Sequence, residues 1–494
     1  MIKTFKELIK DSLTYGLSSI IGQIIGFLLL PLYTTYLTTT DYGIMAMLLI
    51  ITAMFVPLSS MGITNAVFRR YNLHLDKSMQ KTSLSTSYTA VFIIAIIWLI
   101  IGTIFINNIT LFLVDEIKYK NLVLITLISG FLSSILAVLN VVLRAKRKVL
   151  ELSAFRIVQL LITIFITVYL VAFKEIGVAG VVWGDFIGVL CVTILQHLYF
   201  KKLIKIKINF EELKELFSYG FPFFPHRLLT YATAFVAQYL IKEFIGMSES
   251  GLYNIALRFA LPLAFVVTAI QSAWVPIKFQ IHREEESNSS NILSNMMNVY
   301  FIFISILFVC VLSIGPDILR LMTTSDFHEA AKYLPFVILI PFSRGIFHVM
   351  GTGFEITKNT KPMPIVSGLG LLVLLIISIL LVDNLGIYAF ILAVILSWST
   401  QALVMRYFSI KRFYVSINYK LLSFLILICL FMSFTYFFIQ DLEFYNRTRI
   451  QICTTIFSLL FILYFTFYYM KNKLNSLYNY NFVLDKFIRF INRF

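Results

Sequence analysis

Apolar runs of about twenty residues recur along the whole sequence and limit its possible folds more than any other feature. A run of that length, wound as a helix, crosses about 30 Å of hydrocarbon. Hydrophobic residues make up 59% of the chain and charged residues 13%, which is too apolar for a soluble core. The runs do not alternate with polar residues, so a transmembrane β-barrel is excluded. We therefore predict an all-α polytopic membrane protein.

The runs predict about fourteen transmembrane helices. The first run has no small-residue cleavage site and is too long for a signal peptide, so we expect it to be retained. All four cysteines fall inside runs at spacings that suit no metal, so we expect neither disulfides nor a metal site. The predicted spans cover residues 13–36, 42–64, 83–106, 121–143, 153–173, 176–199, 216–241, 251–276, 292–314, 331–354, 364–382, 385–405, 421–439 and 450–470.

The net charge of +16 reflects membrane topology rather than binding to nucleic acid. If both termini are cytoplasmic, most of the 41 Lys and Arg residues fall in inner segments and few fall in outer loops. This bias is the positive-inside rule, and it favours an even number of spans. We expect a multi-pass protein of the bacterial inner membrane with both termini in the cytoplasm.

Three short sequence matches suggest that the chain contains two six-helix units. Both units would enter the membrane from the same side, related by an axis along the membrane normal and separated by a cavity. We predict an N-terminal lobe at 1–205, a second lobe at 206–412, and two additional helices with a basic cytoplasmic tail at 413–494. The matches are Leu13-Thr14-Tyr15-Gly16 with Phe217-Ser218-Tyr219-Gly220, Asp41-Tyr42-Gly43 with Gly251-Leu252-Tyr253, and Ile176-Gly177-Val178 with Leu385-Gly386-Ile387.

Four arginines lie inside the apolar runs: Arg156, Arg227, Arg258 and Arg344. Arg156 is near the end of its run, where its side chain can reach the surface. Each of the others would cost about 2.5–3.5 kcal/mol at the bilayer centre, so we expect them to face a hydrated interior. The spans supply few carboxylates: Asp185 lies about nine residues into its run, and Glu355 lies near the inner end of the run at 331–354. At least one arginine should therefore attract an anion, and guanidinium suits a phosphate or pyrophosphate head group.

Other polar residues in the spans each have two interpretations. His226 and His348 either widen the basic patch or only hydrogen-bond to neighbours. Asp185 is either a proton or sodium coupling site or the permanent partner of an arginine. Pro222 and Pro225 break a span that either lines a cavity or is only kinked. The predicted substrate-binding residues are Arg227, Arg258, Arg344, His226, His348, Gln23 and Asn65.

Several short motifs give the chain a resemblance to a known family. They are Leu30-Pro31-Leu32, Asp41-Tyr42-Gly43, Pro57-Leu58, Gly62-Ile63, Phe68-Arg69-Arg70-Tyr71, Gly220-Phe221-Pro222 and Gly251-Leu252-Tyr253. With these motifs and its span order, the chain resembles the polysaccharide flippases (O-antigen and capsule types) of the multidrug/oligosaccharidyl-lipid/polysaccharide exporter superfamily. That family often has an Asp-Arg pair late in span 7, where this sequence has Ala237-Gln238. Any role of the pair would then pass to other residues.

The resemblance implies a two-bundle flippase for undecaprenyl-(pyro)phosphate-linked oligosaccharides, working by alternating access and driven by an H+ or Na+ gradient. It implies no cofactor and no catalytic residue. The expected partners are the lipid-linked oligosaccharide, membrane lipids, the coupling ion and other polysaccharide-assembly membrane proteins. A peptidoglycan-precursor flippase would use the same cavity chemistry.

Two further alternatives come from other functional classes. A multidrug-type cation antiporter shares the fold, but the deep charges here are mainly positive. A membrane polysaccharide polymerase or glycosyltransferase would need an extramembrane catalytic loop. The outer connections are short and hold no carboxylate pair that would suit such a loop.

Overall fold

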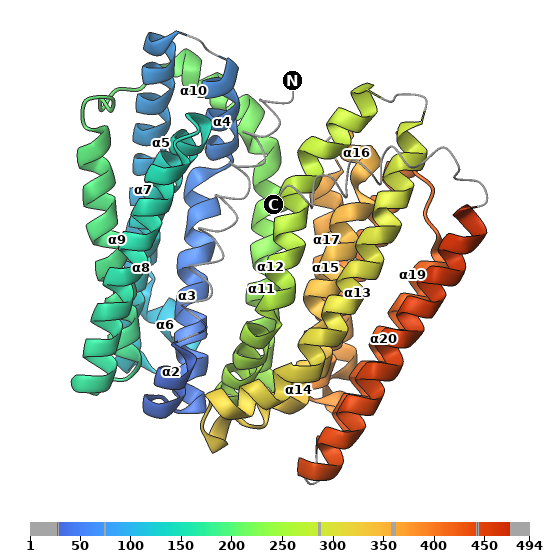
Figure 1. The fold of residues 1–494 in the computed structure, drawn as a ribbon. Coiled ribbons are helices and arrows are strands. Elements are labelled where there is room, and N and C mark those ends of the chain that lie inside the picture. Colours follow the sequence, from blue (N-terminus) through green and yellow to red (C-terminus); the bar gives the residue numbers. More distant parts are fainter. Residues whose placement is uncertain are drawn as a thin grey trace.

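The computed structural model describes residues 27, 29–73, 76–284, 288–356, 362–440, 442 and 444–474. These residues form helices and their connections, with no strand among them, so the predicted all-α class is confirmed (Figure 1). Twelve described segments are long and apolar enough to cross a membrane. They are α3, α5, η1 with α7, α8 with η2, α9, α12, α13, η4 with α14 and α15, α17, α18, α19 and α20.

We call residues 29–200 the first half. Its centre is α3, which packs against α5, α7 and α9 and also against α11 and α12 of the rest of the chain. The helices of the first half are α2 (Leu30–Tyr36), α3 (Thr39–Ser60), α4 (Ile63–Leu73), α5 (Lys77–Ile104), α6 (Ile106–Val114), η1 (Ile117–Tyr119), α7 (Lys120–Ala145), α8 (Val149–Val168), η2 (Tyr169–Phe173) and α9 (Val178–Phe200).

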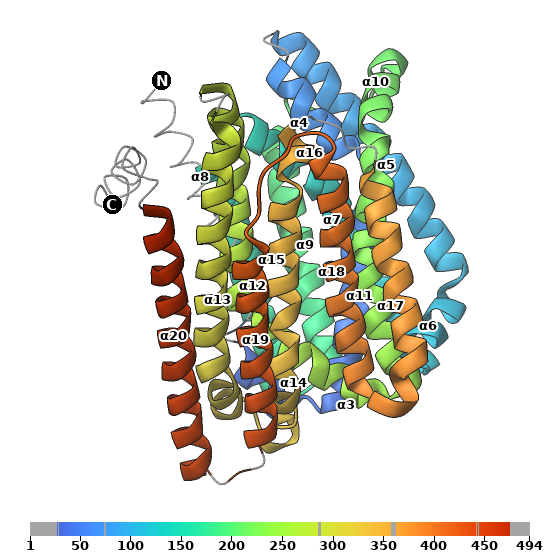
Figure 2. The same cartoon turned by 90° about the vertical axis from the view of Figure 1, so that its right-hand side faces the viewer.

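The second half runs from residue 210 to residue 410, and α19 and α20 follow it. Figure 2 shows α19 and α20 beside α13, which both of them contact. The helices are α10 (Phe210–Gly220), η3 (Phe221–Phe223), α11 (Phe224–Phe244), α12 (Met247–Glu284), α13 (Ser289–Met322), η4 (Ser325–Phe327), α14 (Ala330–Val337), α15 (Leu339–Met350), α16 (Thr352–Ile356), α17 (Met363–Leu385), α18 (Ile387–Ile410), α19 (Tyr419–Ile439) and α20 (Phe444–Leu474).

Two of the predicted spans are not among the twelve segments. Most of the span at 13–36 lies outside the described residues. The span at 216–241 is divided into α10, η3 and α11, and α11 carries several charged side chains that lower its hydropathy. Because α11 packs against α3, α12, α17 and α18, it still runs through the bundle. The number fourteen stays a prediction.

The helix break predicted from two prolines is confirmed. Pro222 lies in the short turn η3, and Pro225 occupies the first turn of α11. A proline at the start of a helix removes only a backbone N–H that has no partner in the helix, so the break is compatible with a stable α11.

The ends of α3 explain two glycine motifs. α3 begins with a capping box between Thr38 and Asp41. Next to it, a Cβ atom on Gly43 would collide with the carbonyl oxygen of Met247, so only glycine lets α12 approach so closely. At its other end, α3 gives way to Gly62 with φ 82°, a conformation that favours glycine.

The bundle has two distinct ends (Figure 1). We call the end with α4, α10 and α16 the basic end, because Arg69, Arg70, Lys146 and Lys148 lie on its helices and connections. The end with α2, α6 and α14 is called the opposite end.

Candidate functional site

The most enclosed span holds an exposed arginine. In the apolar stretch of 18 residues that defines the span Ser325–Met350, 83% is buried, the largest share among the twelve spans. Within α15, Arg344 alone is exposed, and His348, one turn later on the same face, is half-buried. A side chain exposed on a helix that is otherwise covered by protein faces an internal hollow rather than lipid.

A face of α11 is also exposed. Arg227, Tyr231 and Ala234 are exposed at the spacing of one helical face, and 42% of Tyr231 is accessible. Tyr231 lies within electrostatic range of Arg344, so α11 and α15 face the same hollow. From α18, the ring of Trp398 lies 5.5 Å from the Arg344 guanidinium carbon, a distance that allows a cation–π contact.

Both candidate histidines are hydrogen-bonded to neighbours. His226 Nδ1 lies 2.5 Å from Ser367 Oγ. Gln271 Nε2 lies 2.8 Å from His348 Nδ1. His348 also lies within electrostatic range of Arg344 and His226, so the two histidines belong to the same basic group as Arg344. The hydrogen bonds to neighbours are thus observed, and a part for these histidines in a basic substrate patch stays a prediction.

Arg227 and Asn65 were both predicted to bind substrate, and the structure brings them together. Arg227 Nη2 donates to Asn65 Oδ1 at 3.0 Å, and Nη1 donates to Thr64 Oγ1 at 3.4 Å. Arg227 lies in the first turn of α11, near the basic end. The sequence had suggested a deeper position, because α10 was taken as the start of the same span.

A second group lies toward the opposite end, near the starts of α3, α9 and α12. The guanidinium carbon of Arg258 lies 5.9 Å from the centre of the Tyr42 ring. The buried Tyr33 lies within electrostatic range of both Arg258 and Asp185. The candidate residues therefore form two groups, one around Arg344 and one around Tyr33.

The charges of these groups are not neutralised by ion pairs. Within the described ranges, Arg227, Arg258, Arg344 and Asp185 form no salt bridge. Of the two interpretations of Asp185, a permanent ion pair with an arginine is thus not observed in this part of the chain. Gln23 and the side chain of Glu355 lie outside what the structure describes.

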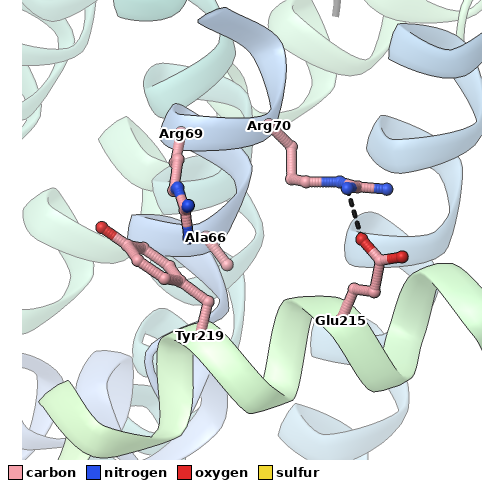
Figure 3. Close-up of a pocket in the computed structure, with 5 residues that line it drawn as sticks. All are labelled: Ala66, Arg69, Arg70, Glu215 and Tyr219. Carbon is pink, nitrogen blue, oxygen red and sulfur yellow. Dashed lines mark ion pairs between the residues drawn. The ribbon is translucent and has the colours of Figure 1, made fainter. Parts of the chain in front are cut away.

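A separate groove lies at the basic end between α4 and α10 (Figure 3). Its cavity of about 150 Å³ is lined by Ala66, Arg69, Arg70, Glu215 and Tyr219. Arg69 stacks over the Tyr219 ring at 4.3 Å, and Arg70 forms an ion pair with Glu215.

Arg70 also pairs with Glu212, and this hydrogen bond raises the pKa of Arg70 above its usual value. The groove therefore holds balanced charges and ties α10 to the first half.

The sequence predictions missed the aromatic side chains of both groups. Tyr33 and Tyr42 are distant in sequence from Asp185 and Arg258, so no local pattern joins them. Tyr231 had a detectable signal, because it follows Arg227 by four residues and therefore shares its helical face.

Known structures with this fold are membrane transporters. A structure described as the lipid II flippase MurJ in an inward closed conformation matches with a TM-score of 0.72 at 17% identity, over 94% of this chain and 99% of that chain. An inward-facing multidrug resistance MATE family transporter of the MOP superfamily matches with a TM-score of 0.66 at 13% identity, over 79% and 94%. A MATE structure in complex with MaD3S matches with a TM-score of 0.61 at 14% identity, over 82% and 95%.

These matches define the class as a multi-pass membrane protein with the MOP-superfamily fold. A search of proteins with curated descriptions gave no match. The family profile described as "Polysaccharide biosynthesis protein" matches residues 8–282, which is more than half of the chain. The chain therefore belongs to that family. The solved structures that share its fold are described as a flippase and as transporters.

Proposed function

We propose that the chain is a flippase that moves an oligosaccharide linked to undecaprenyl phosphate or pyrophosphate across the bacterial inner membrane. The observation that carries this proposal is the exposure of Arg344 on the most enclosed span, within electrostatic range of Tyr231. Such a hollow offers charge for a phosphate and a polar aromatic surface for a sugar.

The sign of the charge separates this function from multidrug export. Around the hollow, Arg227 and Arg344 form no ion pair within the described ranges, so their positive field favours an anion. An organic cation would be repelled by the same field. A guanidinium group forms two parallel hydrogen bonds to the oxygens of a phosphate, and these bonds are stronger where little water competes for them. This chemistry suits the phosphate head group of a lipid carrier.

Asp185 is the proposed site of cation coupling. It lies on α9 beside Tyr33 and forms no ion pair within the part of the chain described. A carboxylate of this kind can bind H+ or Na+. Its change in charge would then alter the electrostatic environment of the neighbouring Arg258 group. The cation would return the transporter to its starting conformation after each cycle of alternating access.

The basic end is proposed to face the cytoplasm, with both termini on that side. The positive charges of α4 and of the α7–α8 connection support this orientation, since cytoplasmic segments are enriched in Lys and Arg. The head group would enter from the inner leaflet while its lipid tail stayed in the bilayer. Other polysaccharide-assembly membrane proteins would supply and receive the substrate.

The test is translocation by the purified chain in vesicles that contain a fluorescent undecaprenyl-pyrophosphate-linked oligosaccharide. We expect transfer between leaflets that rises when a H+ or Na+ gradient is applied and is reduced in Arg344→Ala. The same vesicles loaded with a fluorescent organic cation should show no export. Export of the cation without movement of the lipid would favour the multidrug function instead.

A further inference from the structure

Each end of α11 contacts the first half through a basic side chain of its own. At the basic end, Arg227 donates to Asn65 and Thr64. At the opposite end, Lys242 Nζ donates to Asp115 Oδ1 at 2.6 Å. Fifteen residues separate the two basic side chains, or about 22 Å along the helix, which is most of the hydrocarbon thickness. The two contacts therefore hold opposite ends of the interface between the halves.

The contact at the opposite end is a charged pair that joins a buried lysine to an aspartate whose side chain is 64% exposed. The Lys242 side chain is only 3% exposed. Its ammonium also lies 3.4 Å from the Phe112 carbonyl oxygen and 3.4 Å from the Glu243 carboxylate. The Phe112 ring stacks on Tyr239 of α11 at 4.3 Å and adds an apolar contact between the same two elements. Without Asp115, the buried ammonium would keep the Glu243 carboxylate of its own helix and the Phe112 carbonyl oxygen, so α11 would lose its ion pair with the first half.

The contact at the basic end is weaker and open to exchange. Arg227 is exposed, and its two partners are an amide and a hydroxyl, both uncharged. A phosphate oxygen is a better acceptor for guanidinium than an amide oxygen. An anionic phosphate group can therefore replace Asn65 as the partner of Arg227.

We propose that α11 is a two-ended latch between the halves. The Lys242–Asp115 pair keeps the opposite end closed while the Arg227–Asn65 contact is exchanged for an anionic phosphate group, and the basic end opens. The second step of the cycle breaks the Lys242–Asp115 pair after the basic end has closed again. This latch rests on the proposed flippase function, and both of its contacts are closed in the structure.

The latch can be tested by distances between pairs of spin labels, in the full chain with its four cysteines replaced. Met79 on α5 and Tyr407 on α18 are exposed labelling positions that report the basic end. Ile104 on α5 and Leu321 on α13 are exposed positions that report the opposite end. Inorganic pyrophosphate serves as the probe for the exchange at Arg227.

Asp115→Asn should raise the population with a lengthened Ile104–Leu321 distance by about tenfold, because a hydrogen bond between charged groups is lost. Glu116→Gln is the matched control, since Glu116 is the next residue and pairs with Lys118 of the first half. The double variant Asp115→Lys with Lys242→Asp should restore the closed distance. Distances in Asp115→Asn equal to those in Glu116→Gln would overturn the latch.

Asn65→Ala should raise the population with a lengthened Met79–Tyr407 distance, by less than the tenfold change expected for Asp115→Asn. Pyrophosphate should raise the same population in the unsubstituted chain. No response to pyrophosphate would overturn the exchange at Arg227. These outcomes are independent of the flippase proposal, which fails only if the unsubstituted chain moves no lipid-linked oligosaccharide in vesicles.

Discussion

The two halves use their interiors for different chemistry. In the first half, Gly180, Gly184 and Gly188 of α9 face α8 so closely that a Cβ atom would collide with Leu170 or Val171, with Thr167 or with Thr163. These glycines make a tightly packed wall, and the same helix carries the carboxylate of Asp185. The second half contributes Arg227, Arg258 and Arg344 instead, together with the hollow around Arg344.

This difference indicates that close packing belongs to the first half and that the charge for a ligand belongs to the second half. Close helix packing through small residues stabilises a membrane bundle without a polar group. Arginines destabilise a bundle unless water or a ligand meets them. The first half is therefore suited to a firm support that senses a cation, whereas the second half holds the positive charge that an anionic substrate requires. The following predictions test that division, from the largest expected effect to the smallest.

Arg344→Ala should reduce translocation of the lipid-linked oligosaccharide by about 100-fold, because a charge-assisted hydrogen bond contributes about 1.5–3 kcal/mol. The vesicle assay above measures the rate. Arg412→Ala is the matched control, because Arg412 is exposed in the connection after α18. Equal rates in the two variants would contradict an anion site in the second half.

Asp185→Asn should abolish the stimulation by an ion gradient, a reduction of about tenfold in rate, while binding of the anionic head group stays normal. The amide keeps the size of the side chain but cannot gain a charge. Translocation is measured with and without the gradient. Asp383→Asn, at the exposed end of α17, is the control and should behave as the unsubstituted chain. If Asp185→Asn still responded to the gradient, the coupling site would not lie at Asp185 in the first half.

Tyr231→Ala should weaken substrate binding by a few-fold, because the hollow loses an aromatic surface of which 42% is accessible. Tyr231→Phe keeps the ring, so it should recover most of the binding if stacking matters and little if the hydroxyl matters. Titration of the purified chain with labelled substrate gives both values. Unchanged binding in both variants would confine recognition to the arginines.

A basic residue of the second half should also make the free energy of unfolding depend on pH. Burial lowers the pKa of Lys278, beyond the membrane span of α12, to about 7. Between that value and its ordinary pKa, only the unfolded chain holds the proton, so stability rises with pH. From pH 7 to about 9, the gain should be on the order of 1–2 kcal/mol.

Thermal unfolding of the unsubstituted chain and of Lys278→Met across this pH range measures the gain. The variant has no group to titrate at this position and should lack the rise. An equal rise in both proteins would assign the effect to other groups.

Most of the fold could be predicted from the sequence because lipid imposes a simple rule. An apolar run that crosses the bilayer must form a helix, since its backbone groups have no other partners there. This rule did not locate the start of α11. The amphipathic α10 continues into α11 through two phenylalanines and a proline, with no polar loop between the two helices. Arg227 consequently lies in the first turn of α11 and not in the middle of one long helix.

The groups of side chains were harder to predict because they join distant elements. Tyr33, Asp185 and Arg258 come from α2, α9 and α12, and only the packed bundle shows that they are neighbours. Conversely, Arg69 and Arg70 were recognised from the sequence as part of a family motif, without a predicted contact. In the structure, they face Tyr219 and Glu215 of α10 and form a contact between elements.

Gly62 and Gly220 meet with their backbones in contact, and a Cβ atom on either residue would collide with the carbonyl oxygen of the other. In a survey of all single substitutions, these two positions should therefore tolerate as little change as residues that touch the substrate. A map of intolerant positions would then place a false binding site at the basic end. Membrane abundance measured for each variant would separate these two glycines from Arg344, whose loss should leave abundance intact.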